Sequence, residues 1–386
     1  MGAESDSAGI LARLVAFDTT SARSNLALID YVQHWLAAQG VDSALVRDPT
    51  QPKAALHAVI GPKVAGGVAL SAHSDCVPVE GQAWQGDPFT LRRAHGRLVG
   101  RGAVDMKGFW ACAMAAVPGL RARDLKRPVH LCLSYDEETS FAGAPILVAA
   151  LPQHAPPPSM CIVGEPSGMA PVIAHKGYAS FEVTITGRTG HSSLTHRTAN
   201  ALEAAAEAVS FLKRRARHHA REGRRVAGFE PPFTTLHTGT FRAGSILNIV
   251  PDRADFVFEI RSVPGDDAQA ELALLRDFLA REVLPELQAI APESGFAIRD
   301  RCLAPPLALA EDSPLLDLAR DCGAIGPAQR VPYGTEAGIF QQAGIASLVC
   351  GPGDLAQAHQ PEEWIAESEL AACDAFLDRL GARLAA

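Results

Sequence analysis

Apolar residues in the first part of the chain follow two different periods. Helical spacing runs over Ile10–Phe17, Leu26–Gln39 and Met106–Leu120, and the Pro118–Gly119 pair marks the expected end of the third helix. Short apolar runs bounded by Gly, Pro or charged residues predict buried strands at Ala55–Ile60, Val68–Ala72, Val129–Tyr135 and Met160–Val163. This alternation predicts an α/β domain with a mostly parallel sheet.

The pattern changes after about residue 177 and returns to the first type near residue 305. Between these points, strand-like and helical segments are arranged as in a small α+β sandwich inserted into the first domain. The strand-like segments are Ala179–Thr186, Phe256–Ile260 and Phe296–Leu303, and the helical ones are Asn200–Leu212 and Ala268–Ile290. A helix from Ser313 and a strand at Ala346–Cys350 follow. We therefore expect one α/β domain in two parts, 1–177 and 305–386, with an inserted domain at 178–304.

Composition narrows the class of protein. The chain has 386 residues, with 35 Lys and Arg against 43 Asp and Glu, which gives a formal charge of −8. The acidic balance argues against nucleic acid as a partner, because phosphate binding demands a basic surface. The longest apolar run, Gly108–Leu120, is too short to cross a bilayer, and Met1–Asp6 lacks the features of a signal peptide. Eight cysteines without a Cys-x-x-Cys pair are typical of reduced thiols, so we expect a cytoplasmic protein without membrane contact.

Residues that could bind metal ions stand where predicted strands end or in loops. In an open α/β sheet, ligands bind beyond the carboxyl ends of the strands. Taken singly, each has a structural explanation: an acid pair is usually a solvated loop, and an aspartate before a helix can cap it. Their joint occurrence next to apolar strands favours a metal site. The candidates are His73, Asp105, Glu137, Glu138, Glu165 and His359.

The chemistry of such a site accounts for this mixture. Two imidazoles and three carboxylates can hold two divalent cations if one carboxylate bridges them. Asp75, two residues beyond His73, is the candidate to orient that imidazole. The adjacent pair Glu137 and Glu138 can supply one ligand and one general base. A complete dinucleotide-binding, P-loop or Gly-x-Ser-x-Gly motif is absent from the sequence.

These residues lie in segments that resemble the two-metal amidohydrolases and peptidases. That family includes acetylornithine deacetylase, succinyl-diaminopimelate desuccinylase, aminoacylase and glutamate carboxypeptidase. The resemblance extends from Ile10–Val15 to the last helix. Its markers are Ser71–Pro78, Gly100–Gly108, Asp136–Glu138, Gly164–Ser167, Gly190–Ser193, Asn248–Pro251 and Glu259–Arg261. Within the family, Tyr333–Ala337, Gly351–Asp354 and Ala358–Pro361 look most like the acetylornithine deacetylases.

The resemblance implies a role for each candidate in the first domain. Asp105 would bridge two divalent ions, zinc first, with cobalt or manganese also compatible. His73 and Glu165 would complete one ion's ligands, and Glu138 and His359 the other's. Glu137 would act as general base and then acid, and Asp75 would orient His73. The expected reaction is hydrolysis of N2-acetyl-L-ornithine, a small N-acyl amino acid, to acetate and L-ornithine.

The inserted domain would act as a lid and dimerisation domain. The resemblance implies that His191 stabilises the oxyanion in the site of a partner subunit, so we expect a homodimer. Arg261 would clamp the substrate α-carboxylate, a task that suits its guanidinium fork, and Asn248 would donate beside it. Glu336 is the candidate to meet the δ-ammonium of ornithine, with a loop salt bridge as the alternative.

Other functions stay open at this point. The same chemistry would serve a general N-acyl-amino-acid hydrolase, a desuccinylase or a dipeptidase, because pocket shape decides the substrate. A non-catalytic binding protein could use the same fold, although the complete ligand set argues against it. A serine hydrolase using Ser74 or Ser192 is a third alternative, which metal chelation would distinguish.

Overall fold

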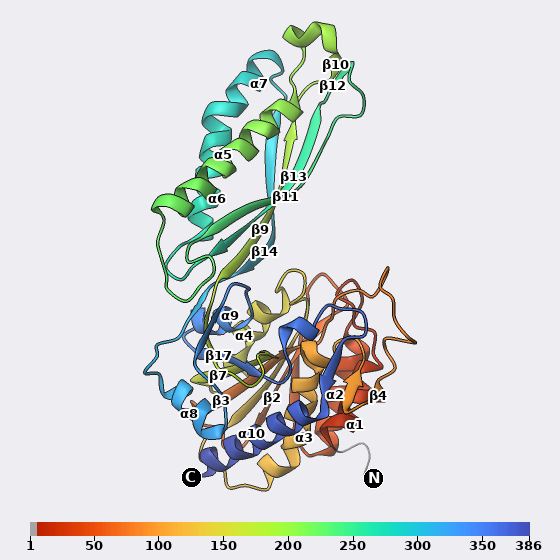
Figure 1. Ribbon diagram of the computed structural model, residues 1–386, viewed down its shortest axis with the longest axis vertical. Helices are drawn as coiled ribbons and strands as arrows, with labels where there is room; N and C mark the ends of the chain where they lie inside the picture. The colour runs from red at the N-terminus through yellow and green to blue at the C-terminus, as the bar shows by residue number, and fades with distance from the viewer. Residues whose placement is uncertain (1–5) are drawn as a thin grey trace. The chain divides into compact units, whose positions relative to one another are not determined.

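The chain divides into two compact units (Figure 1). The computed structural model describes residues 6–386, so most of the Met1–Asp6 segment considered above lies outside the described residues. Unit 1 comprises the described residues up to Ala174, together with Leu307–Arg330 and Thr335–Ala386. Unit 2 comprises His175–Pro306 and Val331–Gly334.

Unit 1 is built on a mixed sheet with a parallel centre. The strand order is β1-β2-β6-β3-β7-β17-β8-β15, and β16 pairs with β8. Strands β6, β3, β7 and β17 run parallel to one another, whereas β1, β2 and β8 are antiparallel to their neighbours. The bounds are β1 Ser43–Arg47, β2 Ala54–Ile60, β3 Val68–His73, β6 Val129–Ser134, β7 Met160–Pro166, β8 Val172–His175, β15 Leu307–Ala308, β16 Gln329–Val331 and β17 Ala346–Gly351.

The helices of unit 1 cover this sheet. Helix α3 packs against α1 and α10, and α10 packs against α8, while α4 and α9 contact each other. Their bounds are α1 Ser7–Val15, α2 Leu26–Ala38, α3 Gly108–Arg121, α4 Gly143–His154, α8 Pro314–Cys322, α9 Ala337–Gln342 and α10 Glu367–Ala385. A small sheet of β4 (Arg92–Ala94), β5 (Arg97–Val99) and β18 (Trp364–Ala366) joins the start of α10.

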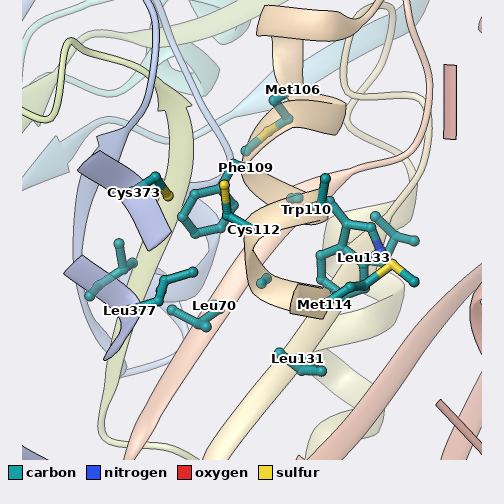
Figure 2. Packing of buried hydrophobic residues seen from close by; sticks show 14 of the residues in the cluster. Leu70, Met106, Phe109, Trp110, Cys112, Met114, Leu131, Leu133, Cys373 and Leu377 are labelled. Carbon is teal, nitrogen blue, oxygen red and sulfur yellow. The ribbon is translucent and has the colours of Figure 1, made fainter. Parts of the chain in front are cut away.

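The main core lies where α3 crosses the central strands. Figure 2 shows Phe109, Trp110 and Met114 of α3 among side chains from β3, β6 and α10. All belong to one buried apolar cluster that extends to α1 and α2. This packing holds the central strands rigidly, which matters because their ends carry the candidate ligands.

Unit 2 is an antiparallel sheet covered by helices, with a core of its own. The strand order is β11-β13-β9-β14, and β13 alternates buried and partly exposed residues as the period-two pattern requires. The bounds are β9 Gly177–Thr186, β11 Thr235–Ala243, β13 Arg253–Ser262, β14 Gly295–Ala304, α5 Ala201–Glu222, α6 Ala268–Phe278 and α7 Leu284–Ile290. The pair β10 (Gly190–His191) and β12 (Ile249–Val250) lies at one end (Figure 1). The predicted fold class, α/β with a mostly parallel sheet and an α+β insertion, is confirmed.

Three of the differences from the sequence prediction have a clear physical reason. Helix α3 does not stop at Pro118–Gly119 but runs to Arg121, because the Pro118 carbonyl still accepts a hydrogen bond from the Ala122 N–H at 3.1 Å. Helix α5 continues ten residues past Leu212 to Glu222, since its charged second half consists of good helix formers without an apolar period. Strand β11 was not predicted, because its side chains are mostly exposed and carry little alternation.

The cysteines and the helix lengths bear on two expectations drawn from composition. In the described part of the chain, all eight cysteines are buried and lie outside any disulfide. None of the described helices combines the length and apolarity that crossing a membrane would require.

Two buried histidines of neighbouring strands contact each other in unit 1. The Nε2 atom of His57 on β2 lies 3.0 Å from Nδ1 of His130 on β6, and each ring's other nitrogen lacks a hydrogen-bond partner. Burial, with repulsion from His130 and His154, lowers the pKa of His57 to about 3. Burial lowers the pKa of His130 to about 4. The native protein therefore keeps both rings neutral where an unfolded chain would protonate them.

We expect the stability of unit 1 to fall as the pH drops from about 6.5 towards 4. Below a pH of about 6.5, the ordinary imidazole pKa, the unfolded chain binds protons at these histidines but the native state does not. Each histidine therefore lowers the free energy of unfolding by up to about 1.4 kcal/mol per pH unit. His57→Gln should reduce the slope of unfolding free energy against pH, measured by urea unfolding with tryptophan fluorescence. The exposed His34→Gln is the matched control. An unchanged slope in His57→Gln would contradict the prediction.

Candidate metal centre

The parallel strands of unit 1 bring the predicted ligands to one edge of the sheet. Strand β3 ends at His73, β6 leads into Glu137 and Glu138, β7 carries Glu165 near its end, and the loop after β17 carries His359. Because parallel strands end at the same edge, these side chains meet although they are far apart in the sequence.

His73 contacts two of the predicted carboxylate ligands. Its Nε2 lies 3.0 Å from Oδ1 of Asp105 and 3.6 Å from Oε1 of Glu165. Burial alone would lower the pKa of His73, but the hydrogen bonds to Asp105 and Asp75 and the charge of Glu165 raise it well above its ordinary value. The surroundings of this imidazole thus strongly favour a positive charge.

The opposite side of Asp105 faces the second imidazole. Nε2 of His359 lies 3.2 Å from Oδ2 of Asp105 and 3.0 Å from Oε2 of Glu138. Hydrogen bonds to Asp105 and Glu138 raise the pKa of His359 to about 10. The two oxygens of Asp105 therefore contact different imidazoles, as a carboxylate placed between two cations would.

The acids around these imidazoles are crowded and buried. His73, Glu137 and Glu165 offer ligand atoms within 4.8 Å of one another, and so do His73, Asp105 and Glu138. Burial and repulsion from Glu165 raise the pKa of Glu137 well above its usual value, and burial with repulsion from Asp105 raises that of Glu138 to about 7. Repulsion between buried carboxylates is relieved by a cation.

The donor set fits divalent cations. Oε1 of Glu165 is buried and has no hydrogen-bond partner, although Nε2 of His73 lies 3.6 Å away, so this oxygen keeps a lone pair available for a ligand. Imidazole nitrogens and carboxylate oxygens are ligands that zinc, cobalt and manganese accept. The residues present can therefore hold metal ions at this edge.

Asp75 has a wider role than orienting His73. Nδ1 of His73 is 3.0 Å from the backbone carbonyl of Asp75 and 3.6 Å from its carboxylate. The same carboxylate accepts hydrogen bonds from the backbone N–H groups of Glu137 at 3.1 Å and Glu138 at 3.3 Å, and from the Ser21 hydroxyl at 2.7 Å. Asp75 thus fixes the backbone of the acid pair.

Two predicted residues meet in unit 2. His191 and Asn248 are exposed, and the Ser192 N–H donates to the Asn248 carbonyl at 3.0 Å, beside the β10–β12 pair. The backbone N–H of Ser193 donates to Nδ1 of His191 at 3.2 Å. Because that nitrogen accepts, the neutral ring carries its proton on Nε2, which is the donor that remains for a ligand.

Arg261 of β13 already has partners within unit 2. Its guanidinium lies 3.8 Å from the centre of the Tyr178 ring, and its Nε is 3.3 Å from Oε1 of Glu259. The side chain is 29% exposed, so its outer edge is open to a ligand. Stacking on an aromatic face also limits the directions in which the guanidinium can point.

Glu336 and Ser74 are both buried in unit 1. Glu336 is 0% exposed, and its carboxylate accepts hydrogen bonds from the hydroxyls of Ser71 and Ser134. Ser74 is 1% exposed, and its hydroxyl donates to the Ser134 carbonyl at 2.7 Å. A hydroxyl so engaged is poorly placed to act as a nucleophile.

Several buried residues that support the site carried no clear signal in the sequence. Lys53 forms an ion pair with Asp136, directly before the acid pair, and its ammonium also donates to the Ser21 carbonyl. Arg101 pairs with Glu363 beside Asp105. An isolated lysine just before a strand, or the second glutamate of an acidic pair, has no spacing that distinguishes it from surface charge.

A mixed α/β sheet that gathers imidazoles and carboxylates at its strand ends is the architecture of a metal-dependent hydrolase. The model of peptidase family M20/M25/M40 matches residues 69–383. The chain belongs to this family.

Similar proteins cover nearly the whole chain. An acetylornithine deacetylase of Myxococcus xanthus is 36% identical over 377 residues, which is 96% of this chain and 95% of the relative. One from Proteus mirabilis (strain HI4320) is 33% identical, covering 91% of this chain and 88% of the relative.

Solved structures share the fold. An M20 family metallo-carboxypeptidase of Sulfolobus solfataricus has a TM-score of 0.76 at 17% identity, covering 98% of this chain and 99% of the other. A dinuclear metal binding M20 peptidase of Bacillus subtilis has a TM-score of 0.64 at 16% identity, covering 97% of both chains.

We expect Asp75→Asn to weaken metal binding. The introduced amide nitrogen cannot accept a hydrogen bond, so the partly buried backbone N–H of Glu137 or of Glu138 loses its partner at a cost of about 1–3 kcal/mol. Changes beside metal ligands typically reduce affinity by about 10–100-fold. Competition of the metal-free protein with a zinc indicator measures this. Ser21→Ala, which removes one hydroxyl but leaves both backbone contacts, should have a smaller effect. Equal zinc affinity in Asp75→Asn and the wild type would refute the role.

Proposed function

We propose that this protein hydrolyses N2-acetyl-L-ornithine to acetate and L-ornithine, using two divalent ions. The observation that carries the proposal is the buried Asp105 carboxylate, whose two oxygens face two imidazoles amid further acids. The substrate rests on similarity over nearly the whole chain to the acetylornithine deacetylases named above. Such an activity would belong to arginine biosynthesis in the cytoplasm.

The protein would hold the two ions with ligands shared around Asp105. His73 and Glu165 would complete one set, and Glu138 and His359 the other, with zinc the first expectation and cobalt or manganese compatible. Polarisation of the amide carbonyl and easier deprotonation of water are the chemistry that such ions supply when bound.

Glu137 is the proposed general base and acid. It sits beside the ligands, its backbone is fixed by Asp75, and its crowded surroundings favour uptake of a proton. A carboxylate there would accept the proton of the attacking water at Oε and later give it to the departing amine nitrogen. His191 would donate from Nε2 to the developing oxyanion, Arg261 would bind the α-carboxylate, and Asn248 would donate beside it.

Glu336 is the proposed partner of the substrate δ-ammonium, although its carboxylate would first have to release the hydroxyls of Ser71 and Ser134. Glu336→Gln distinguishes the two roles. A loss of activity on N-acetylornithine but not on N-acetylmethionine supports recognition of the ammonium, and an equal loss on both supports a purely structural role.

We expect activity on N-acetylornithine that a chelator removes and added zinc or cobalt restores. Glu137→Gln should lower kcat by about 10²–10⁴-fold while metal content stays that of the wild type, because it removes proton transfer and not a proposed ligand. The exposed Thr139→Ala, in the same loop, is the matched control.

Steady-state rates on N-acetylornithine, N-acetylmethionine, N-succinyl-diaminopimelate and a dipeptide measure the preference. If the protein prefers another of these substrates, the proposed chemistry stands but the substrate assignment changes. The protein would then be a general acyl-amino-acid hydrolase, a desuccinylase or a dipeptidase. Chelator-resistant activity would refute the metal mechanism, and a folded, metal-loaded protein without activity would favour a binding protein.

We expect His191→Ala to lower kcat by about 10²–10³-fold, or about 2.7–4 kcal/mol, as loss of an oxyanion donor typically does. His196→Ala, also exposed and in the same loop, is the control for local disturbance. An unchanged kcat in His191→Ala would rule out the oxyanion role.

A homodimer in which His191 serves the partner's site is part of this proposal. The exposed apolar residues Ile246 and Leu247, 59% and 96% exposed beside Asn248, are consistent with a surface that another chain covers. Light scattering measures the mass. Mixing His191→Ala with Glu137→Gln should restore activity, because mixed dimers would contain one site with both groups intact. A dimer whose mixture stays inactive would instead assign His191 to its own subunit.

A further inference from the structure

A buried glutamate outside the predicted site holds the backbone at Asp105. Oε1 of Glu363 accepts hydrogen bonds from the N–H groups of Val104 at 3.0 Å and Asp105 at 3.2 Å. The Glu363 carbonyl also accepts from the Gly100 N–H at 2.9 Å. Three donors of the segment that leads to the proposed bridging ligand therefore depend on one residue just ahead of β18.

The other oxygen of Glu363 is bound by Arg101. Nη1 of Arg101 lies 2.6 Å from Oε2 of Glu363, and the two side chains are 0% and 1% exposed. The guanidinium also donates to the side-chain oxygen of Gln82 and, at 3.5 Å, to the Gln360 carbonyl. Arg101 thus connects the Asp105 segment with the loop that carries His359.

Gln82 completes the connection on the His359 side. Its Nε2 donates to the His359 carbonyl at 3.1 Å, while its Oε1 accepts from Arg101 and, at 3.1 Å, from Nε1 of Trp84. His359 has a φ of 60°, a left-handed conformation that non-glycine residues adopt only when the surroundings hold them. A hydrogen bond to the carbonyl of that residue helps to hold it.

We propose that Glu363, Arg101 and Gln82 are positioning residues that set the placement of Asp105 relative to His359. The inference rests on the metal centre of the proposed function. Glu363 contacts the backbone of Asp105, Gln82 contacts the backbone of His359, and Arg101 joins Glu363 to Gln82. These hydrogen bonds reach backbone groups of the two proposed ligands and not the ligand atoms themselves. Their effect is to fix the bridging carboxylate and the more exposed imidazole before an ion binds, so that binding does not have to order them.

The energetics favour this role over simple stabilisation. A buried ion pair recovers little more than its desolvation cost, and an apolar pair of similar size often stabilises a core as well. Only groups with fixed donors and acceptors can hold two backbone segments in a defined orientation. The planar guanidinium of Arg101 has that geometry, because Nη1 donates to Glu363 and Gln360 while Nη2 donates to Gln82.

Three variants separate the parts of this network. Gln82→Glu keeps an acceptor for Arg101 but removes the donor to the His359 carbonyl. Glu363→Gln removes the charge that Arg101 neutralises and weakens the contact to the Asp105 segment. Glu362→Gln is the matched control, because the adjacent Glu362 pairs with Arg92 at the surface and contacts neither proposed ligand.

The experiment is zinc titration of the metal-free proteins by indicator competition, with circular dichroism and thermal unfolding of each. We expect Glu362→Gln to bind two zinc ions with the same affinities as the wild type. Gln82→Glu should weaken one ion by about 10–100-fold and spare the other, and Glu363→Gln should weaken both. The thermal unfolding midpoint of metal-free Gln82→Glu should stay close to that of the metal-free wild type. A merely structural role for Gln82 would predict a lower midpoint instead.

Each outcome is decisive. Two ions bound with wild-type affinities by folded Gln82→Glu and Glu363→Gln would overturn the positioning role and leave the proposed function intact. If Glu363→Gln does not fold, the loss of one ion in Gln82→Glu still supports the inference, and wild-type binding in that variant overturns it. A wild type that binds no zinc overturns the metal centre and this inference together. Activity on another substrate affects neither the titration nor its interpretation.

Discussion

The carboxylates at one edge of the sheet in unit 1 lie so close together that their mutual repulsion has to be offset by positive charge or by bound protons. Asp75, Asp105, Glu137, Glu138 and Glu165 converge there, mostly out of contact with solvent. Buried like charges must take up protons or meet cations. The raised pKa values of Glu137, His73 and His359 express that demand within the protein. Most features around the site supply positive charge or hydrogen-bond donors to these acids.

The fold meets this demand with rigid elements on one side and tethered loops on the other. His73 and Glu165 belong to central strands, whose positions follow from the packing of α3 against β3 and β6 (Figure 2). His359 lies in a loop and depends on hydrogen bonds to its neighbours. The core therefore fixes the proposed ligands on strands, His73 and Glu165, whereas local polar contacts hold His359 in its loop.

Sequence patterns predicted the part of this arrangement that follows from burial. Apolar runs revealed the central strands, and the strand ends pointed to His73, the acid pair and Glu165 as neighbours, which the structure brings together. The pattern could not reveal β11, which has little buried surface. Nor could it reveal the burial of Glu336, which precedes α9 and whose partners are serines of β3 and β6. Nor could it show that the Asp75 carboxylate binds the backbone N–H groups of Glu137 and Glu138, because hydrogen bonds between distant residues produce no periodic pattern in the sequence.

The insertion of unit 2 has a consequence for how this protein loses its structure. The chain leaves unit 1 after β8 and returns at β15, and these strands are neighbours in one sheet, so unit 1 closes its sheet across the insertion. Each unit has its own apolar core. Cooperativity is therefore expected within each unit rather than across the chain, and a two-state treatment does not apply to the whole protein. Unit 1 contains all four tryptophans, which are Trp35, Trp84, Trp110 and Trp364. Tryptophan fluorescence therefore does not report the unfolding of unit 2.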